Sequence, residues 1–382
     1  MKILVCGGGT GGHVTPILAV AHELKKLSPD AQIIYVGERN GKFGDLVAQD
    51  VAIDEVHTIF AGKLRRYHGE SWFSRLLDVK TLLKNIRDGF LVLIGIIQSM
   101  WLLSKVKPDV IFLKGGFVVV PIGFAAALRK IPFVTHDSDA MPGLANRLVG
   151  RWARWHATGM PVEFYNYPKE TTRYVGVLVS EAFKPVDDTL QREYRAKITI
   201  PAEAKMLLIT GGSLGAQRLN EAVAKLVPQL LSKYSDLYIM HQVGKGNLGT
   251  YKQDIPRDRL KVFEFISDMY LYMGAADAVV TRAGANNLAE LGMQGKACIV
   301  VPNPQLSGGH QLENAKYLLQ HHAVLVVDET SINNSDNKLG EATELLLNNP
   351  EARTRLGTAL AALSKPQAAR ELAQLILEAA KP

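Results

Sequence analysis

Cysteine is scarce in this chain, which has two, Cys6 and Cys298, among 382 residues. Two cysteines cannot build a disulfide framework or a four-cysteine metal site, and this usage is typical of a reducing cytoplasm. No zinc-finger spacing and no RNA-recognition signature occurs, so a nucleic-acid partner is not expected. The chain opens directly on an apolar strand pattern, and we therefore expect no secretion signal.

A long hydrophobic run is also lacking. The best candidate, 89–104, has about 16 residues with Gln98 near its centre, whereas a helix that spans a bilayer needs about 20. It follows a basic and aromatic stretch, 61–88, and this combination is typical of a helix that lies in a membrane interface. A buried core helix preceded by a solvated basic face explains the same residues, so both interpretations remain open.

The composition is that of a folded globular protein, with 47% hydrophobic and 21% charged residues. A chain of this length exceeds one ordinary core, so two domains of about 150 to 200 residues are expected. The net charge of +7 suits an anionic partner such as a membrane surface or a phosphorylated substrate.

Five glycines within 7–12 stand between a predicted strand at 2–6 and a predicted helix at 16–27. Such a loop exposes amide N–H groups at the positive end of a helix dipole, which suits phosphate. The same glycines fit a dinucleotide site with Glu38 as the ribose-binding acid, so an NAD-dependent dehydrogenase is a rival interpretation. His13 follows the loop, where an imidazole suits a base, or else caps the turn.

Predicted strands and helices alternate along the chain, which favours parallel sheets with helices on both faces. Ligands of such sheets bind beyond the carboxyl ends of the strands. Residues with site chemistry follow two predicted strands: Gly115 and Gly116 follow 109–113, and His136, Asp137 and Asp139 follow 131–135. The acidic pair suits a base, a hydroxyl acceptor or a divalent ion, and the alternative is that an aspartate caps the next helix.

The arrangement of the N-terminus recurs in the second half, where a predicted strand at 205–210 runs into a glycine loop at 211–215 and then a helix. Two such loops favour paired nucleotide-binding domains that face a cleft. Further along, Arg282 suits phosphate, Glu290 suits the two hydroxyls of a ribose, and the amide-rich segment 310–314 suits a sugar. The alternative interpretations of these residues are ordinary helix capping and a solvated ion pair between Arg282 and Glu290.

Six motifs occur in a fixed order along the chain: Gly8-Gly9-Thr10-Gly11-Gly12-His13-x-x-Pro16, Gly115-Gly116-Phe117-x-x-x-Pro121, His136-Asp-Ser-Asp139, Gly211-Gly212-Ser213-x-Gly215-Ala216-x-x-Leu219-Asn220, Phe265-Ile266-x-Asp268-Met269, and Arg282-x-Gly284-Ala285 with Glu290. The set resembles the family 28 glycosyltransferases of peptidoglycan synthesis. The resemblance implies an α/β GT-B fold of two Rossmann-like, doubly wound domains that face an interdomain cleft. Residues 1–176 would bind the acceptor and the membrane, 177–362 would bind the UDP-sugar, and a helix in 363–382 would pack back on the first domain.

The implied enzyme is an inverting hexosyltransferase. It would move N-acetylglucosamine from UDP-N-acetylglucosamine to the lipid-linked N-acetylmuramoyl-peptide (lipid I), giving lipid II, as a peripheral protein on the cytoplasmic face of the plasma membrane. The alternatives are another GT-B enzyme, either a glycolipid glycosyltransferase or a UDP-sugar epimerase, and a non-catalytic relative that binds the sugar nucleotide or lipid. No cofactor is expected, although the Asp137-x-Asp139 pair leaves magnesium open.

The resemblance also implies a role for each site residue. The base is expected to be His13, with His136 or Asp137 as second choices. Residues that contact the substrates would be Thr10, Gly11 and Gly12 on the acceptor side, and Asp139, Ser213, Asn220, Ile266, Arg282, Ala285, Asn286, Asn287, Leu288, Ala289, Glu290 and Gln311 on the donor side.

The chain departs from the family pattern in three segments. The family usually has His-Glu-Gln-Asn where this chain has 136–139, so the amide contact to the donor sugar falls on Asp139. A tyrosine is usual where Phe117 stands, and an expected arginine falls on Ser180.

Overall fold

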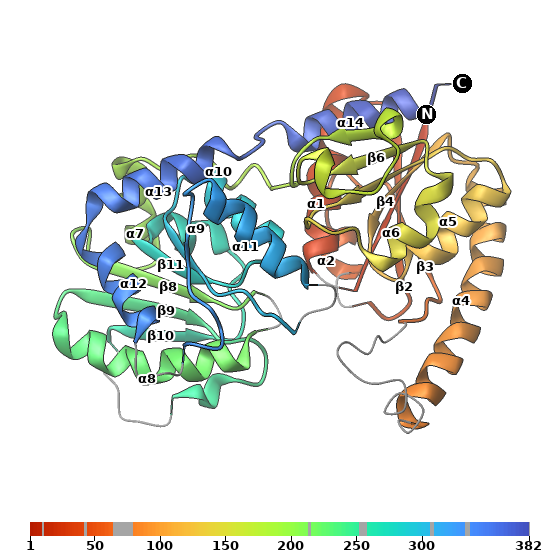
Figure 1. Ribbon diagram of the computed structural model, residues 1–382. Coiled ribbons are helices and arrows are strands. Elements are labelled where there is room, and N and C mark those ends of the chain that lie inside the picture. The colour runs from red at the N-terminus through yellow and green to blue at the C-terminus, as the bar shows by residue number, and fades with distance from the viewer. Residues whose placement is uncertain are drawn as a thin grey trace. The chain divides into compact units, whose positions relative to one another are not determined.

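The computed structural model describes residues 1–9, 11–41, 44–63, 79–212, 215–251, 258–305, 309–332 and 337–381. Each half of the chain is built on its own parallel sheet, as the alternation of elements predicts (Figure 1). Unit 1 comprises Met1–Ser180 and Lys365–Pro382, and unit 2 comprises Glu181–Ser364. The boundaries expected from the sequence, after 176 and after 362, lie within a few residues of these.

The described part of unit 1 forms a seven-stranded sheet in the order β3-β2-β1-β4-β5-β6-β7. Its strands are β1 (Lys2–Gly7), β2 (Gln32–Glu38), β3 (Glu55–Ile59), β4 (Val110–Gly115), β5 (Phe133–Asp137), β6 (Trp155–Thr158) and β7 (Thr172–Tyr174). Neighbouring strands pair in parallel. The sequence order reverses between β1 and β4, which is the switch point of a doubly wound sheet.

Helices cover both faces of this sheet because its central strands are apolar on both sides. Ile3 and Val5 of β1 belong to a core with α1 (Gly11–Leu27) and α14 (Ala368–Ala379). Leu4 and Cys6 belong to a second core with α4 (Val79–Val106) and α5 (Val119–Leu128). The alternation follows from the two-residue repeat of a strand, and a strand buried on both faces reads as one continuous apolar run.

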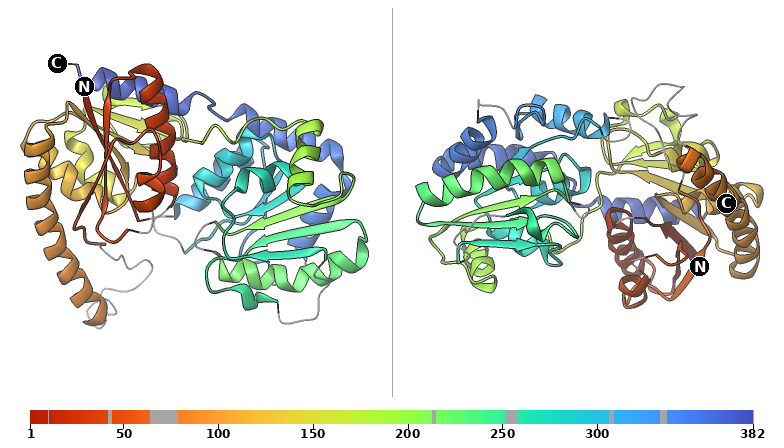
Figure 2. Two further views of the ribbon diagram at one scale, coloured as in Figure 1. Left: turned by 180° about the vertical axis from the view of Figure 1, so that it is seen from behind. Right: turned by 90° about the horizontal axis from the view of Figure 1, so that it is seen from below.

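The helix α14 returns to unit 1 from beyond unit 2 in the sequence and lies beside α1 (Figure 2). Its inward side chains recur at helical spacing, and Leu372 and Ile376 have no exposed surface. They complete the core formed by α1 and one face of the sheet.

Three strands of unit 1 have no counterpart in the sequence-based expectation: β3, β6 and β7. β3 and β7 are the edges of the sheet, and their residues, Glu55–Ile59 and Thr172–Tyr174, are largely polar. An edge strand with a solvated face lacks the apolar run that identifies a buried strand. The short helices α2 (Gly44–Ala48) and α6 (Leu144–Val149) complete the regular structure named here for unit 1.

The described part of unit 2 forms a six-stranded sheet in the order β10-β9-β8-β11-β12-β13. Its strands are β8 (Lys205–Thr210), β9 (Leu237–Gln242), β10 (Leu260–Phe263), β11 (Ala278–Thr281), β12 (Cys298–Val300) and β13 (Leu325–Val326). Its helices are α7 (Asp188–Lys197), α8 (Gln217–Lys233), α9 (Met269–Ala275), α10 (Ala285–Met293), α11 (His310–Gln320), α12 (Lys338–Asn348) and α13 (Pro350–Ala362). The order reverses between β8 and β11, so the second sheet repeats the topology of the first.

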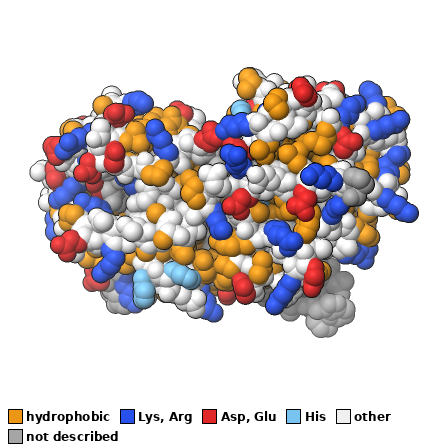
Figure 3. Space-filling model, turned by 90° about the horizontal axis from the view of Figure 1, so that it is seen from above, with side chains coloured by type: hydrophobic (Ala, Val, Ile, Leu, Met, Phe, Trp, Pro, Cys, Tyr) orange, Lys and Arg blue, Asp and Glu red, His pale blue; other side chains and the backbone are white. Residues whose placement is uncertain are grey.

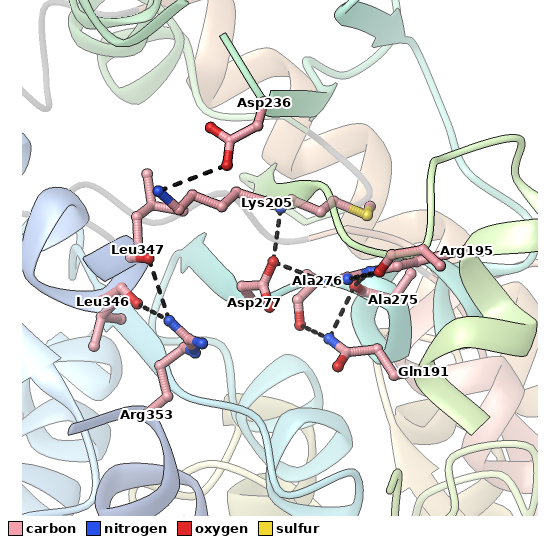
Figure 4. A network of polar contacts seen from close by, with 12 residues as sticks. Gln191, Arg195, Lys205, Asp236, Ala275, Ala276, Asp277, Leu346, Leu347 and Arg353 are labelled. Atoms are coloured by element: carbon pink, nitrogen blue, oxygen red, sulfur yellow. Dashed lines mark hydrogen bonds and ion pairs between the residues drawn. The ribbon is translucent and has the colours of Figure 1, made fainter. Parts of the chain in front are cut away.

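An ion pair ties α7 to the amino ends of the strands of unit 2 (Figure 4). Arg195 on α7 lies 2.7 Å from the Asp277 carboxylate, which also accepts a hydrogen bond of 2.8 Å from the backbone N–H of Met206. Arg195 donates further to the carbonyl oxygens of Ala275 and Ala202. These polar contacts lie at the amino edge of the sheet, whereas the glycine loops follow the carboxyl ends of the strands, at the opposite edge.

The helix α4 contains the apolar run seen in the sequence but begins before it, at Val79. By length and composition its residues 81–106 could cross a membrane. One face nevertheless packs on the unit: Gln98 accepts a hydrogen bond of 2.8 Å from the backbone N–H of Phe60, and a Cβ added to Gly95 would lie 2.1 Å from the Phe60 carbonyl oxygen. Gln98 therefore marks the docked face of the helix.

Candidate active site

Each unit places a glycine loop at the switch point of its sheet. In unit 1 the loops after β1 and β4 meet there, and in unit 2 the loops after β8 and β11 do so. Open parallel sheets bind their ligands at this position, because the two neighbouring loops run to opposite faces and leave a crevice. The site residues expected from the sequence follow these strands or their neighbours.

The two loops of unit 1 touch through glycine. Gly116 has φ +81°, and a Cβ on it would lie 2.3 Å from the carbonyl oxygen of Gly8. Gly115 has φ +128°, and a Cβ there would lie 3.4 Å from the ring of His13. Both positions need the positive φ that favours glycine, and Gly116 also needs the missing side chain, since its Cβ would overlap the Gly8 carbonyl oxygen and lie 3.3 Å from Nδ1 of His13.

His13 lies in the first turn of α1, and its Nδ1 is 2.9 Å from the carbonyl oxygen of Gly8. A carbonyl oxygen accepts, so Nδ1 carries the hydrogen and Nε2 carries the lone pair. Burial, together with the positive charge of Lys114, lowers the pKa of His13 to about 4. The ring is therefore neutral at physiological pH, which is the state that a base requires. Thr10 lies outside the described residues, and Gly11 and Gly12 begin α1.

His136, at the end of β5, is fully buried. Its Nε2–H donates to the carbonyl oxygen of Gly176 at 2.9 Å, and burial lowers its pKa well below the usual value. An imidazole enclosed in this way has no path to a substrate hydroxyl. We therefore assign His136 to holding the turn at Gly176 and no longer to catalysis.

Asp137 is also enclosed, and its contacts support the capping alternative. One carboxylate oxygen accepts from the backbone N–H of Gly143, just before α6, at 2.9 Å and from the Asn146 amide at 3.0 Å. The other accepts from the Tyr167 hydroxyl at 2.9 Å. These contacts occupy both oxygens, so Asp137 fits neither the role of a base nor that of a magnesium ligand. Burial raises its pKa.

Asp139 is half-buried, and its backbone carbonyl accepts a hydrogen bond of 2.7 Å from Tyr165. Its carboxylate acts on its neighbours through charge, opposing the fall in the pKa values of His13 and Lys114. Among the described residues, no group of three His, Cys, Asp or Glu side chains is arranged to hold a metal ion.

Lys114 is a site residue that the sequence analysis missed. It precedes Gly115 at the carboxyl end of β4, is 3% exposed, and donates a hydrogen bond of 2.9 Å to the Ser138 hydroxyl. Burial lowers its pKa to about 8. From the sequence alone, a lysine within an apolar strand does not reveal which side chains will lie around it.

In unit 2 the loop after β8 is held by Gln242 at the end of β9. Its amide donates to the carbonyl oxygen of Gly212 at 3.1 Å and accepts from the backbone N–H of Ile266 at 2.9 Å. The backbone N–H of Ile266 is therefore satisfied within the unit. Ser213 lies outside the described residues.

The helix α10 begins at the other side of this switch point. Its first residues, Ala285 to Leu288, include Asn287, whose amide donates to the Thr281 hydroxyl at 3.3 Å. The N–H groups of a first helical turn lack intrahelical acceptors and carry the positive end of the dipole. Ala285, Asn286, Asn287 and Leu288, predicted as donor contacts, thus form an N-terminal turn that suits an anion, and Ala289 follows them.

Glu290 lies half-buried in the second turn of α10. Burial raises its pKa to about 8. Within the described part of the chain, its carboxylate has no hydrogen-bond donor and no cation beside it. A partly desolvated carboxyl without a protein partner suits ligand hydroxyls, which would compensate its lost hydration.

Two residues predicted on the donor side make their bonds inside unit 2. Arg282 is 5% exposed, pairs with Glu329, which Arg218 also contacts at 3.3 Å, and donates to the carbonyl oxygen of Val301. Asn220 is 2% exposed and bonds the carbonyl oxygen of Val243 and the ring of His241. Both shape the loops from inside the unit.

Gln311 is the second residue of α11, and its Oε1 accepts from the backbone N–H of Asn303 at 2.9 Å. This bond orients the side-chain amide. Asn314, one turn later, donates to the carbonyl oxygen of Ala283 at 2.9 Å and so joins α11 to the turn before α10.

Solved structures share this architecture. The Acinetobacter baumannii MurG crystal structure is 25% identical, with a TM-score of 0.70 over 99% of both chains. A Neisseria meningitidis UDP-GlcNAc 2-epimerase bound to UDP-GlcNAc has a TM-score of 0.65 at 14% identity, covering 99% of this chain and 100% of that chain, and shows the fold alone. Two doubly wound units with a glycine loop at each switch point define a GT-B protein.

Sequence comparison narrows this class to a single family. The glycosyltransferase family 28 N-terminal domain matches residues 3–158, and the family 28 C-terminal domain matches 206–373. A relative from Natranaerobius thermophilus is 30% identical over 98% of this chain and 99% of its own length, and one from Clostridium perfringens is 36% identical over 87% of each. Both are named UDP-N-acetylglucosamine–N-acetylmuramyl-(pentapeptide) pyrophosphoryl-undecaprenol N-acetylglucosamine transferase. The chain belongs to glycosyltransferase family 28.

Proposed function

We propose that this chain transfers N-acetylglucosamine from UDP-N-acetylglucosamine to N-acetylmuramyl-(pentapeptide) pyrophosphoryl-undecaprenol, a step of peptidoglycan synthesis. The observation that carries the proposal is the near full-length relationship to transferases with this name. The two switch-point sites agree with it, because a diphosphate on each substrate calls for two anion-binding loops.

On the donor side, UDP-N-acetylglucosamine binds in unit 2. The first turn of α10 and the loop after β8 receive the diphosphate through backbone N–H groups, since Arg282 is paired with Glu329. Glu290 accepts the ribose hydroxyls, the uracil lies against Ile266, and the Gln311 amide donates to the sugar.

On the acceptor side, the muramoyl hydroxyl attacks the anomeric carbon from the face opposite the diphosphate. The new C–O bond forms as the bond to the UDP oxygen breaks, which inverts the configuration. Nε2 of His13 takes the hydroxyl proton, and the electron pair of the broken bond leaves on UDP. The helix N-termini stabilise that charge, so the reaction needs no metal ion.

We further propose that α4 holds the enzyme on a membrane as a peripheral protein, where the lipid-linked acceptor resides. Eight large apolar side chains of α4 are exposed, at the helical spacing of a single stripe: Leu82, Leu83, Ile86, Phe90, Leu93, Ile94, Ile97 and Trp101. Lys105 lies over the Trp101 ring. Figure 3, which shows the molecule from above the view of Figure 1, has Lys and Arg side chains along its right-hand edge. The docked face at Gly95 and Gln98 favours a helix lying in the interface over a spanning one. The use of UDP-sugar favours the cytoplasmic face.

UDP release tests the function, with purified protein, UDP-N-acetylglucosamine and a short-chain analogue of the lipid-linked muramoyl peptide. We expect turnover in the wild type and a loss of about 10²-fold to 10⁴-fold in His13→Ala, with UDP-sugar binding retained. UDP-sugar binding without turnover in the wild type would contradict the transfer reaction. Activity on the sugar nucleotide alone would instead favour the epimerase alternative.

A further inference from the structure

The buried lysine of unit 1 has no role in the reaction as described so far. Lys114 and His13 are close neighbours at the switch point. Lys114 precedes Gly115, where a Cβ would lie 3.4 Å from the His13 ring, and a Cβ on Gly7 would lie 3.3 Å from both the Lys114 Cβ and the His13 carbonyl oxygen. The ammonium group is fixed rather than free to swing, because it donates to the Ser138 hydroxyl at 2.9 Å and is enclosed.

Titratable groups from three segments interact with Lys114 through charge. His136 and Asp137 end β5, Asp139 lies in the following loop, and His13 lies in α1. The two aspartates favour the ammonium form of Lys114. That form in turn disfavours a second positive charge on either imidazole. Three of the residues involved, Asp137, Ser138 and Asp139, are positions where the chain departs from the family pattern.

We propose that Lys114 is a positioning residue of the transfer reaction: its ammonium group, anchored by Ser138 and held charged by Asp137 and Asp139, repels a proton from the His13 imidazole. This charge adds to the larger effect of burial, and together they keep His13 in the basic form at acidic and neutral pH. The inference rests on the proposed function of His13 as the base. It concerns a charge that acts through His13, without contact to the substrate.

The pH dependence of kcat/KM separates this role from a structural one. Lys114→Met keeps the apolar stem and removes the charge, so the acid midpoint of the profile is expected at higher pH than in the wild type. Below that midpoint kcat/KM falls roughly tenfold per pH unit. Lys169→Met, which removes an exposed lysine of the same unit, is expected to leave the midpoint unchanged.

Titration of the His13 ring by NMR, assigned with His13→Gln, measures the same effect without any substrate. The His13 pKa should rise in Lys114→Met and, by a smaller amount, in Ser138→Ala, which keeps the charge but loses its anchor. Ser138→Ala also serves if Lys114→Met does not fold.

An unchanged His13 pKa in these variants overturns the proposal. A higher KM for the lipid-linked acceptor with an unchanged pH midpoint also overturns it, because that result would make Lys114 a substrate contact. The two readouts also separate the inference from the function. A wild type that releases no UDP would refute the proposed transfer, while the NMR titration would still decide whether Lys114 controls His13.

Discussion

Glu290 and Arg282 show how differently two charged residues at one switch point can be used. Both follow β11, and the sequence assigns both to the donor. Arg282 turns inward to Glu329, 47 residues further along the chain, whereas the Glu290 carboxylate has no partner in the part of the chain that the structure describes. Sequence spacing predicted both residues as donor contacts, but it could not tell which of them would pair with a residue distant in the chain.

The raised pKa of Glu290 predicts that donor binding releases a proton. At pH 7 a carboxyl with a pKa of about 8 is protonated, and hydroxyl donors from a ribose favour its charged form, so binding lowers that pKa. Calorimetry in buffers of different ionisation enthalpy should therefore detect the release of roughly one proton per UDP-sugar bound, and affinity should fall as the pH drops below 8.

Glu290→Gln is the matched control, since it keeps the shape of the side chain and cannot ionise. It should bind more weakly and without proton release. Equal proton release in both proteins would show that another group titrates.

At the scale of single elements, α4 combines a docked face and an exposed apolar face within one helix. The apolar run is compatible with both an interfacial helix and a core helix, and the pattern does not separate them because apolar residues occur on all sides of the helix. The helix docks through a hydrogen bond from the backbone N–H of Phe60 to Gln98. A hydrophobic pattern cannot predict a contact made by the backbone. Strands with apolar residues on both faces were predicted, whereas the polar edge strands β3 and β7 were not.

Two glycines of α4 should respond in opposite ways to alanine. A Cβ on Gly89 meets nothing within 4 Å, so Gly89→Ala should stabilise the helix by about 0.5–1 kcal/mol. Gly95→Ala should destabilise unit 1 by about 1–3 kcal/mol, because the new methyl group would overlap the Phe60 carbonyl oxygen. Denaturant unfolding of the two variants measures both effects, and equal shifts would contradict the docking of α4 at Gly95.

Membrane binding should depend on the exposed stripe of α4. In Ile97→Glu combined with Trp101→Glu, two exposed apolar side chains become charged, and co-sedimentation with anionic vesicles should drop at least tenfold. Leu319→Glu combined with Leu345→Glu makes the same exchange at exposed positions of unit 2 and should bind like the wild type. Equal losses in both double variants would assign the binding to general charge.

At the scale of the whole molecule, two sheets of the same topology carry two kinds of site. The sequence predicted this arrangement because each sheet begins with a buried strand, a glycine loop and a helix. The division into units is less regular than the repeat implies, because α14 follows unit 2 in the chain and packs in unit 1.

This packing predicts which unit a C-terminal mutation weakens. Leu372→Ala removes a fully buried side chain from the core shared with α1 and should lower the stability of unit 1 by about 2–5 kcal/mol. Gln374→Ala, exposed on the same helix, should have little effect. Differential scanning calorimetry with and without a UDP-sugar assigns the transitions, since the donor should shift that of unit 2. A shift of the UDP-sugar-sensitive transition in Leu372→Ala would contradict the assignment.

The return of α14 also sets the order in which the protein can mature on the ribosome. Every strand of unit 2 is synthesised before α14, so unit 2 can fold while the α1 face of the first sheet is still uncovered. The core around Ile17 and Val20 is completed only when α14 has been synthesised. A nascent chain stalled before that helix would therefore present an unfinished acceptor half beside a finished donor half.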